Sequence, residues 1–210
     1  MSNRRKFEVS FHIPTRHELS VHEAGHAYAF AALRWPDEPA QIGLGVDEAG
    51  AHHGWSRRST ILYKEVRLRR DDPETLAYQK WCAAAEIVVL FAGPLAEFRH
   101  RHRSRMGAAF LMSGNVDVFL HPGSFDQVGD FEGIRAALAY VEAKDARSAF
   151  LELLWIADEI LAANWPLLRR LAAHLRERDV LDADEVVSWF ESEPVRRWEQ
   201  GARLRDALGD

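Results

Sequence analysis

The sequence predicts a mainly α-helical protein with a small β element, in which a buried helix near the N-terminus precedes a C-terminal helical bundle. Apolar residues recur at helical intervals over residues 16–34, 74–92 and 146–191, with few internal glycines or prolines. Only residues 41–62 alternate in the manner of strands. Hydrophobic residues make up 47% and charged residues 28% of the 210 residues, which is the balance of a globular protein.

The first helix is expected to run from Arg16 to Arg34. Thr15 can cap its N-terminus, and Glu18, three residues later, completes a capping box. Trp35-Pro36 ends the helix, because the residue before a proline disfavours the helical conformation. Gly25 occupies the helix interior at a cost of about 1 kcal/mol relative to alanine. This glycine indicates that another backbone approaches the helix closely.

Two histidines and a glutamate in this helix form the pattern His-Glu-x-x-His, at His22, Glu23 and His26. Four helical residues separate the histidines by about 6 Å along the axis, so both imidazoles can converge on one tetrahedral ion. Glu23 lies about 100° around the helix from His22 and need not bind the ion. A bound metal lowers the pKa of its water molecule, and a neighbouring carboxylate can accept the proton as the water attacks a carbonyl group. Because the pattern is typical of zinc hydrolases, we expect a metal site with Glu23 as its base.

A catalytic zinc ion needs a third protein ligand, and the sequence leaves several candidates. The metzincin pattern has glycine three residues and histidine six residues after the second histidine. It is excluded, because Ala29 and Ala32 occupy these positions. A helix is expected to begin near Asp130, which makes this residue either a ligand or simply a helix cap. The third ligand must come from farther along the chain, and the candidates are Glu86, Glu97, Asp117, His121, Asp126 and Asp130.

Four segments together resemble the peptidase domain of the FtsH-type ATP-dependent zinc proteases. They are HEAGHA at 22–27, AGPLAE at 92–97, GDFE at 129–132 and the tail ILAANWPLLRRLAAHLRERDVLDADEV at 160–186. The resemblance extends over residues 15–190 and implies an FtsH peptidase-domain-like fold with a zincin-like metal helix. It implies that His22, His26 and Asp130 bind Zn²⁺ and that Glu23 activates water. In the family the third ligand stands in an Asn-Asp-Leu context, which Gly-Asp-Phe replaces here, so Asp126, Glu86 and Glu97 stay open as alternatives to Asp130.

The expected function is zinc-dependent hydrolysis of peptide bonds in unfolded or peptide substrates. The chain is expected to form a single domain, with a metal-site half at 1–145 and C-terminal helices at 146–210. No G-x-x-x-x-G-K-[ST] phosphate loop occurs, so we expect no ATPase activity in this chain. A polypeptide substrate is the expected partner, and a homo-oligomer and a separate ATPase are further candidates. The alternative is a non-catalytic metal-binding regulatory or scaffold protein. An iron site with two histidines and one carboxylate is a third possibility, against which the neighbouring Glu23 argues.

The composition argues against several other classes of protein. The formal net charge of -5 implies no general affinity for nucleic acid, and the basic run Arg99–Arg105 is expected at a solvated helix end. The single cysteine, Cys82, excludes an internal disulfide and fits a cytoplasmic location. No secretory signal is recognisable at the N-terminus. The apolar stretch Trp81–Phe98 contains two glutamates and a break at Gly93-Pro94, which favours a buried helix over a membrane span.

The remaining elements are expected from local patterns. Residues 41–46 and 52–62 read as two strands around a turn, and such a hairpin beside the metal helix can hold an extended peptide as one more strand. A purely structural hairpin is equally compatible with the pattern. His52 and His53 are expected in an exposed loop, and residues 106–128 as an irregular loop. Four C-terminal helices are expected, at 146–163, 165–177, 183–191 and 194–208, the first pair separated by Asn164-Trp165-Pro166.

Overall fold

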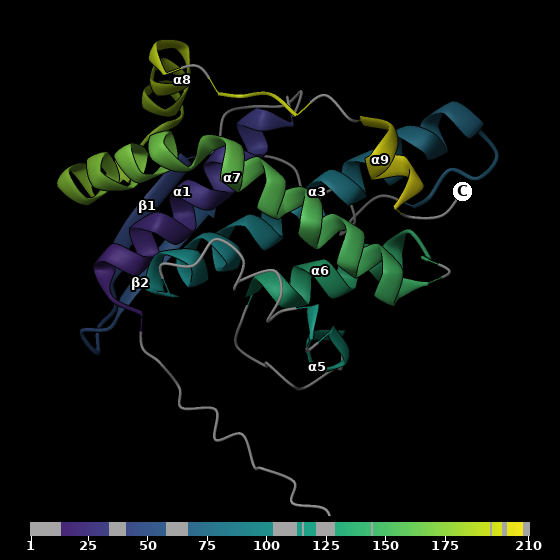
Figure 1. The fold of residues 1–210 in the computed structure, drawn as a ribbon, viewed down its shortest axis with the longest axis horizontal. Helices are drawn as coiled ribbons and strands as arrows, with labels where there is room; N and C mark the ends of the chain where they lie inside the picture. Colours follow the sequence, from purple (N-terminus) through teal and green to yellow (C-terminus); the bar gives the residue numbers. More distant parts are fainter. Residues whose placement is uncertain are drawn as a thin grey trace, which may run out of the picture.

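A three-stranded sheet lies on one side of a helical body in the computed structural model of the chain (Figure 1). The structure describes residues 14–33, 41–57, 67–102, 113–114, 116–120, 129–143, 145–193, 195–198 and 201–207. The prediction of a mainly α-helical protein with a small β element is confirmed. The described elements are α1 (Arg16–Ala32), β1 (Gln41–Val46), β2 (His52–Arg57), α3 (Pro73–His102), α5 (Val116–Leu120), α6 (Gly129–Tyr140), α7 (Ala146–Arg178), β3 (Val180–Leu181), α8 (Ala183–Ser192) and α9 (Gly201–Asp206).

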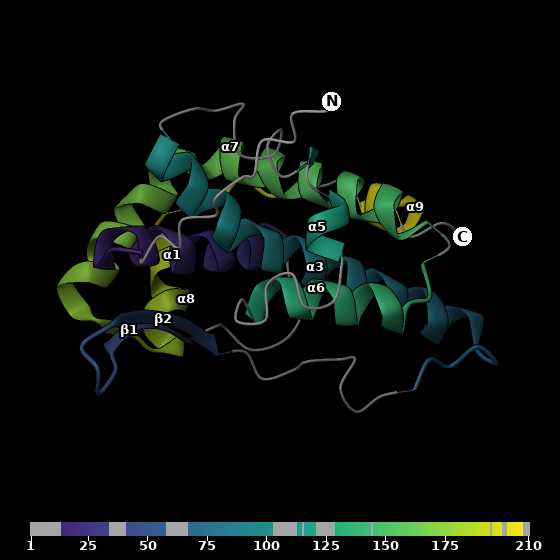
Figure 2. The same cartoon turned by 90° about the horizontal axis from the view of Figure 1, so that it is seen from below.

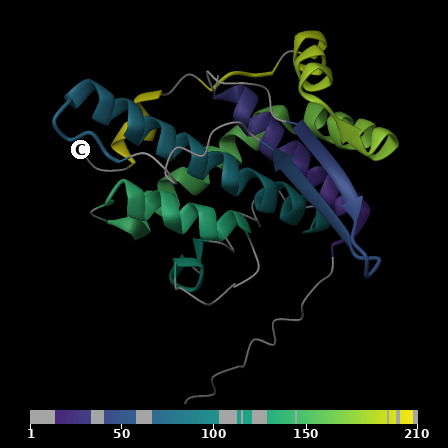
Figure 3. The same cartoon turned by 180° about the vertical axis from the view of Figure 1, so that it is seen from behind.

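Helices α1 and α3 lie in the middle of the body. Helix α7 covers one side of this pair, while the β1–β2 hairpin and α6 lie on the other (Figure 2). Seen from behind, the hairpin crosses α1, and α6 lies beside α3 (Figure 3). The apolar core includes fully buried side chains from these helices, among them Tyr28, Ile87, Phe91, Phe150 and Leu153. The metal helix predicted from the sequence is therefore a core element with neighbours on several sides.

The start of α1 and its glycine follow the sequence prediction. Thr15 Oγ1 accepts the backbone N–H of Glu18 at 3.2 Å, and the Glu18 carboxylate accepts the N–H of Thr15 at 2.7 Å. The predicted capping box is thus confirmed. A Cβ added to Gly25 would lie 2.5 Å from the carbonyl oxygen of Ala92 and 2.8 Å from Ala96 Cβ, so the expected close approach of a second backbone is also present. Trp35-Pro36, the predicted end of the helix, lies outside the described residues.

The predicted helix breaks at Gly93-Pro94 and Asn164-Trp165-Pro166 are wrong. Helices α3 and α7 each continue through their proline. A proline removes one backbone hydrogen bond from a helix interior, but both helices bury apolar side chains before and after it, and this packing outweighs the local preference. The Asn164 side chain donates to the Ile160 carbonyl oxygen at 2.9 Å and accepts the N–H of Arg196 at 2.8 Å. Asn164 therefore ties α7 to a later segment instead of ending it.

The sheet has the order β2-β1-β3, with antiparallel neighbours. The predicted first strand and the turn after it are confirmed, and Gly50 in this turn has a φ of 82°. Strand β2 follows as predicted, although residues 58–62 lie outside the described residues. His52 and His53 are exposed, as expected, but they belong to β2 and not to a loop. Strand β3 is not predicted by the sequence, because two residues are too few to show an alternating pattern.

The C-terminal region is helical as predicted, but its last segment differs from the prediction, and so does the stretch before α6. The capping box of Asp182 and Glu185 opens α8 as predicted. The helix expected at 194–208 is described only over α9, while 195–198 are not helical. In that segment the N–H of Trp198 donates to the Ala32 carbonyl oxygen at 3.1 Å, a tertiary contact that replaces a helical one. Helix α5 lies in the stretch expected to be an irregular loop, most of which is outside the described residues.

Helix α3 is the most apolar long helix and carries part of the basic run. Its best 18-residue window has a mean hydropathy of 1.5, so length and composition alone would suit a membrane span, and 78% of the window is buried inside the protein. Arg99 is only 8% exposed, and its guanidinium lies 4.5 Å from the ring centroid of Trp165. The expectation of a solvated basic run is therefore wrong for Arg99. Residues 103–105 lie outside the described part of the chain.

Candidate metal centre

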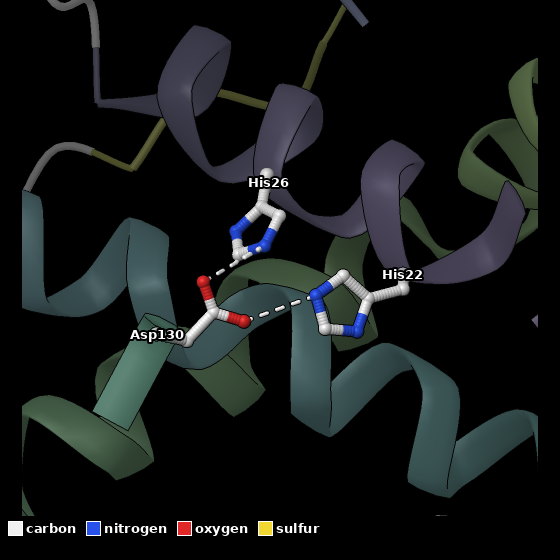
Figure 4. A group of neighbouring side chains, drawn as sticks. All are labelled: His22, His26 and Asp130. Atoms are coloured by element: carbon white, nitrogen blue, oxygen red, sulfur yellow. Dashed lines mark hydrogen bonds and ion pairs between the residues drawn. The ribbon is translucent and has the colours of Figure 1, made fainter. Parts of the chain in front are cut away.

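The two histidines of the predicted motif share one face of α1, and Asp130 approaches them from the first turn of α6 (Figure 4). His22 Nε2 lies 3.0 Å from Asp130 Oδ2, and His26 Nε2 lies 3.5 Å from Asp130 Oδ1. One ligand atom from each of the three residues lies within 4.8 Å of the other two. Ligand atoms around a tetrahedral zinc ion, with bonds of about 2.0 Å, stand roughly 3.3 Å apart. The three side chains are thus spaced so that they can hold a metal ion.

The second nitrogen of each imidazole is held by α3. His26 Nδ1 lies 2.7 Å from the carbonyl oxygen of Val89, and His22 Nδ1 lies 3.1 Å from Glu97 Oε2. Carbonyl and carboxylate oxygens only accept hydrogen bonds, so both Nδ1 atoms carry the hydrogen. Contacts of this kind fix the ring orientation of metal-binding histidines. They leave the two Nε2 atoms directed toward the same carboxylate.

Gly93 leaves room for the two ligand nitrogens to approach one point. A Cβ at this position would lie 2.3 Å from His26 Nε2 and 2.6 Å from His22 Nε2. Any larger residue would enter the space that an ion and its ligands need. Together with the nitrogen and carboxylate donors, this gap fits a metal ion. The sequence predicts a helix break at Gly93 and does not reveal this role, for which the available signal is a glycine inside an apolar helix.

The pKa values of His22 and Asp130 are shifted so that the two side chains attract each other. Burial acts to lower the pKa of His22, but hydrogen bonds to Asp130 and Glu97 outweigh it and hold this pKa well above its usual value. Burial acts to raise the pKa of Asp130, but the charges and hydrogen bonds of His26 and His22 outweigh it and hold this pKa far below its usual range. His22 and Asp130 therefore favour opposite charges. A metal ion that takes the Nε2 lone pairs would displace a proton, as metal binding to such ligands generally does.

Glu23 lies beside this group without belonging to it. Its side chain is buried, and its carboxylate lies against strand β2, since a Cβ added to Gly54 would be 2.4 Å from Glu23 Oε1 and 2.9 Å from its Cγ. The charge of Glu23 contributes to the high pKa of His22. Among the described residues, the group that converges consists of His22, His26 and Asp130. Gly54 is a second glycine at the site whose importance the sequence does not reveal.

The other candidates for the third ligand take different positions. Glu97 contacts the Nδ1 of His22, on the opposite side of the ring from Asp130. Glu86 lies three turns before Glu97 on α3, about 16 Å away along the helix axis. Asp117 is exposed and forms an ion pair with an arginine of α7. Two further candidates, His121 and Asp126, lie outside the described residues.

Comparison with known proteins does not add to this geometry. No protein-family model matches the chain, and no match is found among curated proteins. The resemblance to FtsH-type peptidase domains therefore stays a prediction.

Proposed function

We propose that the chain is a zinc-dependent metallopeptidase in which His22, His26 and Asp130 bind Zn²⁺. The observation that carries the proposal is that one ligand atom from each of these three residues lies within 4.8 Å of the other two. Two imidazoles and a carboxylate are a donor set of catalytic zinc sites, which keep a fourth position open. The side chains of His22 and Asp130 are 16% and 19% exposed, so the group is not sealed from solvent.

Glu23 is the proposed general base. Zn²⁺ held by His22, His26 and Asp130 would act as a Lewis acid, polarising a carbonyl group and lowering the pKa of water. Glu23 accepts the proton of the attacking water and then delivers it to the nitrogen of the leaving amine. Its neighbours favour this role, because the Gly54 backbone confines the carboxylate on one side. Glu97 and Val89 keep the two imidazoles oriented throughout.

An extended polypeptide suits the surroundings of Glu23. Strand β2 crosses α1 and brings Gly54 against the Glu23 side chain. Within the described part of the sheet, β2 pairs with β1 on one side only. A substrate strand that pairs with the other side of β2 would pass close to Glu23. Unfolded chains and peptides are the substrates that can adopt this conformation.

Metal identity separates this proposal from the iron alternative. Two histidines and one carboxylate also bind Fe(II) in oxygenases, whereas the adjacent Glu23 is useful to a hydrolase. Elemental analysis of the purified protein distinguishes the two. A separate ATPase, a homo-oligomer and a cytoplasmic location stay predictions from the sequence. A non-catalytic metal-binding protein is the outcome if zinc is bound and no polypeptide is cleaved.

The proposal is tested by elemental analysis together with cleavage of casein and of an unstructured peptide, with and without chelator. Glu23→Gln keeps the shape of the side chain but cannot accept the proton. We expect this variant to keep its zinc and to lose at least about 100-fold in cleavage rate, the lower bound for general-base catalysis. Glu142→Gln, at an exposed ion pair with Arg70, serves as the matched control. Cleavage at the wild-type rate by zinc-loaded Glu23→Gln would exclude the proposed role of Glu23.

A further inference from the structure

We propose that Arg101, anchored by Glu18, is a positioning residue of the metal centre that holds Glu97 in the orientation in which it fixes His22. The inference rests on the proposed function insofar as His22 is taken to bind the metal ion. It assigns a role to a residue of the basic run, which sequence analysis places on a solvated helix end. Arg101 itself touches neither the ion nor a substrate.

A continuous series of polar contacts connects the start of α1 to the metal-binding face. His22 Nδ1 donates to Glu97 Oε2 at 3.1 Å, and Glu97 Oε1 accepts from Arg101 Nη2. Arg101 Nε donates to Glu18 Oε1 at 3.1 Å, and Glu18 Oε2 accepts the N–H of Thr15 at 2.7 Å. Each oxygen of the two carboxylates therefore has its own partner. The series leaves α1 at Glu18, passes through α3, and returns to α1 at His22.

This arrangement differs from an ordinary surface ion pair. The side chains of Glu18, Glu97 and Arg101 are 10%, 19% and 30% exposed, whereas those of the Arg70–Glu142 pair are 62% and 64% exposed. Exposed ion pairs are screened by water and contribute little. The Arg101–Glu18 contact is partly buried, whereas the Arg101–Glu97 contact is more exposed. Charge-assisted hydrogen bonds are stronger than neutral ones and fix the direction of their groups. The planar guanidinium uses two of its nitrogens to bridge two carboxylates, which the point charge of a lysine cannot reproduce.

Arg101 affects His22 by restricting the side-chain rotations of Glu97. A glutamate on a helix can turn about three side-chain bonds, so Glu97 alone would hold the imidazole in several directions. Arg101, four residues later on the same helix, occupies the second oxygen and restricts these rotations. Glu18 in turn restricts Arg101, and Glu18 is itself held by the capping box. The Nε2 of His22 is thereby kept on the side of the ring that faces Asp130.

The test measures metal binding and does not depend on catalysis. Zn²⁺ affinity is determined by chelator competition, and the visible spectrum of the Co²⁺-loaded protein reports the ligand geometry. We expect Arg101→Met to weaken zinc affinity by about tenfold, the lower end of the effect of outer-shell partners, and to alter the cobalt spectrum. Arg101→Lys should restore part of both. Arg70→Met, which removes an arginine from an exposed ion pair, is the matched control and should change neither.

A second pair of variants separates positioning from a general contribution to stability. If Arg101 acts through Glu97, Arg101→Met should cause little further loss of affinity in a Glu97→Gln background. An equal loss in both backgrounds overturns the inference, as does wild-type affinity with an unchanged cobalt spectrum in folded Arg101→Met. If Arg101→Met does not fold, Arg101→Lys is measured instead, and wild-type affinity and cobalt spectrum in that variant overturn the bridging role of the guanidinium.

The two proposals fail in different ways. If zinc affinity changes as expected but the wild-type protein cleaves no polypeptide, the peptidase proposal fails and the positioning role of Arg101 stands. If the wild-type protein cleaves peptides with zinc but Arg101→Met binds zinc normally, the positioning role fails alone. A wild-type protein that binds neither zinc nor cobalt overturns both.

Discussion

Replacing Gly93 with alanine would place a methyl group between the two ligand nitrogens. Its Cβ would lie 2.3 Å from His26 Nε2 and 2.6 Å from His22 Nε2, whereas ordinary contacts begin at 3.4 Å. The nitrogens would have to retreat by about 1.1 and 0.8 Å, the differences between these distances. Zinc–nitrogen bonds stay within about 0.2 Å of their usual 2.0–2.1 Å. A displacement of this size would therefore remove at least one ligand from the ion.

The imidazoles cannot retreat from Gly93 without loss, because their Nδ1 atoms are bonded to other residues of the same helix, α3. His26 is bonded to the Val89 carbonyl oxygen and His22 to Glu97. Breaking a buried hydrogen bond costs about 1–3 kcal/mol, and each 1.4 kcal/mol is a factor of ten in affinity. Loss of both bonds at the lower end of this range weakens binding by more than tenfold. With a ligand removed as well, we expect zinc affinity to fall by at least about 100-fold.

Chelator competition on folded Gly93→Ala measures this affinity, with circular dichroism as the check on folding. Gly129→Ala is the matched control, since Gly129 precedes Asp130 and a Cβ there meets nothing within 4 Å. We expect wild-type zinc affinity in the control. Wild-type zinc affinity in folded Gly93→Ala would refute the assignment of the two Nε2 atoms as ligands.

Three other substitutions test other parts of the structure. Gly54→Ala should lower peptide cleavage by about 100-fold and leave zinc affinity unchanged. The added Cβ would lie 2.4 Å from Glu23 Oε1 and would displace this carboxylate but no ligand. Steady-state kinetics measure the cleavage rate, and chelator titration measures the zinc affinity. Gly25→Ala should lower the free energy of unfolding by about 2 kcal/mol, measured by denaturant titration. Overpacking costs about 1–3 kcal/mol, and we expect the upper end because the added Cβ would meet the Ala92 carbonyl oxygen. Replacing glycine with alanine regains only about 1 kcal/mol of helix propensity, so overpacking outweighs it. Burial raises the pKa of Tyr28 to about 12, whereas an unfolded tyrosine titrates near 10. The corresponding stability is complete below pH 10 and is lost as the pH rises toward 12, so Tyr28→Phe should show a smaller loss of stability over that interval in denaturation experiments.

The group that could hold a metal ion is predictable from the sequence where its geometry is local. His22, Glu23 and His26 lie within five positions of one helix, so helical spacing alone puts the imidazoles on one face. Asp130 follows His22 by 108 residues, and residue-level reasoning leaves it among six candidates. Only the packing of α6 beside α3 selects it. The role of Glu97 is not predictable from the sequence either. Its position in the chain does not distinguish a metal ligand from a residue that orients a ligand, as Glu97 does for His22.

The wrong predictions about α3 and α7 have a common cause. Proline effects act over a few residues and favour a helix end. Both prolines lie in helices whose apolar side chains are buried before and after the proline, so packing along many residues outweighs the local effect. Continuity of α3 through Pro94 has a consequence for the site, because Val89, Gly93 and Glu97 then share one helix face toward α1.

The sequence by itself determined the mainly helical character, the capping boxes and the spacing of His22 and His26, because these depend on interactions between residues a few positions apart. The tertiary structure alone decided which carboxylate joins the histidines, why Gly93 and Gly54 carry no side chain, and that Arg101 turns toward Glu97 and Glu18. Helices α1 and α3 run in opposite directions, so that His22 meets Glu97 while His26 meets Val89. Such contacts join positions that are distant along the chain, and only the packing of whole helices brings them together.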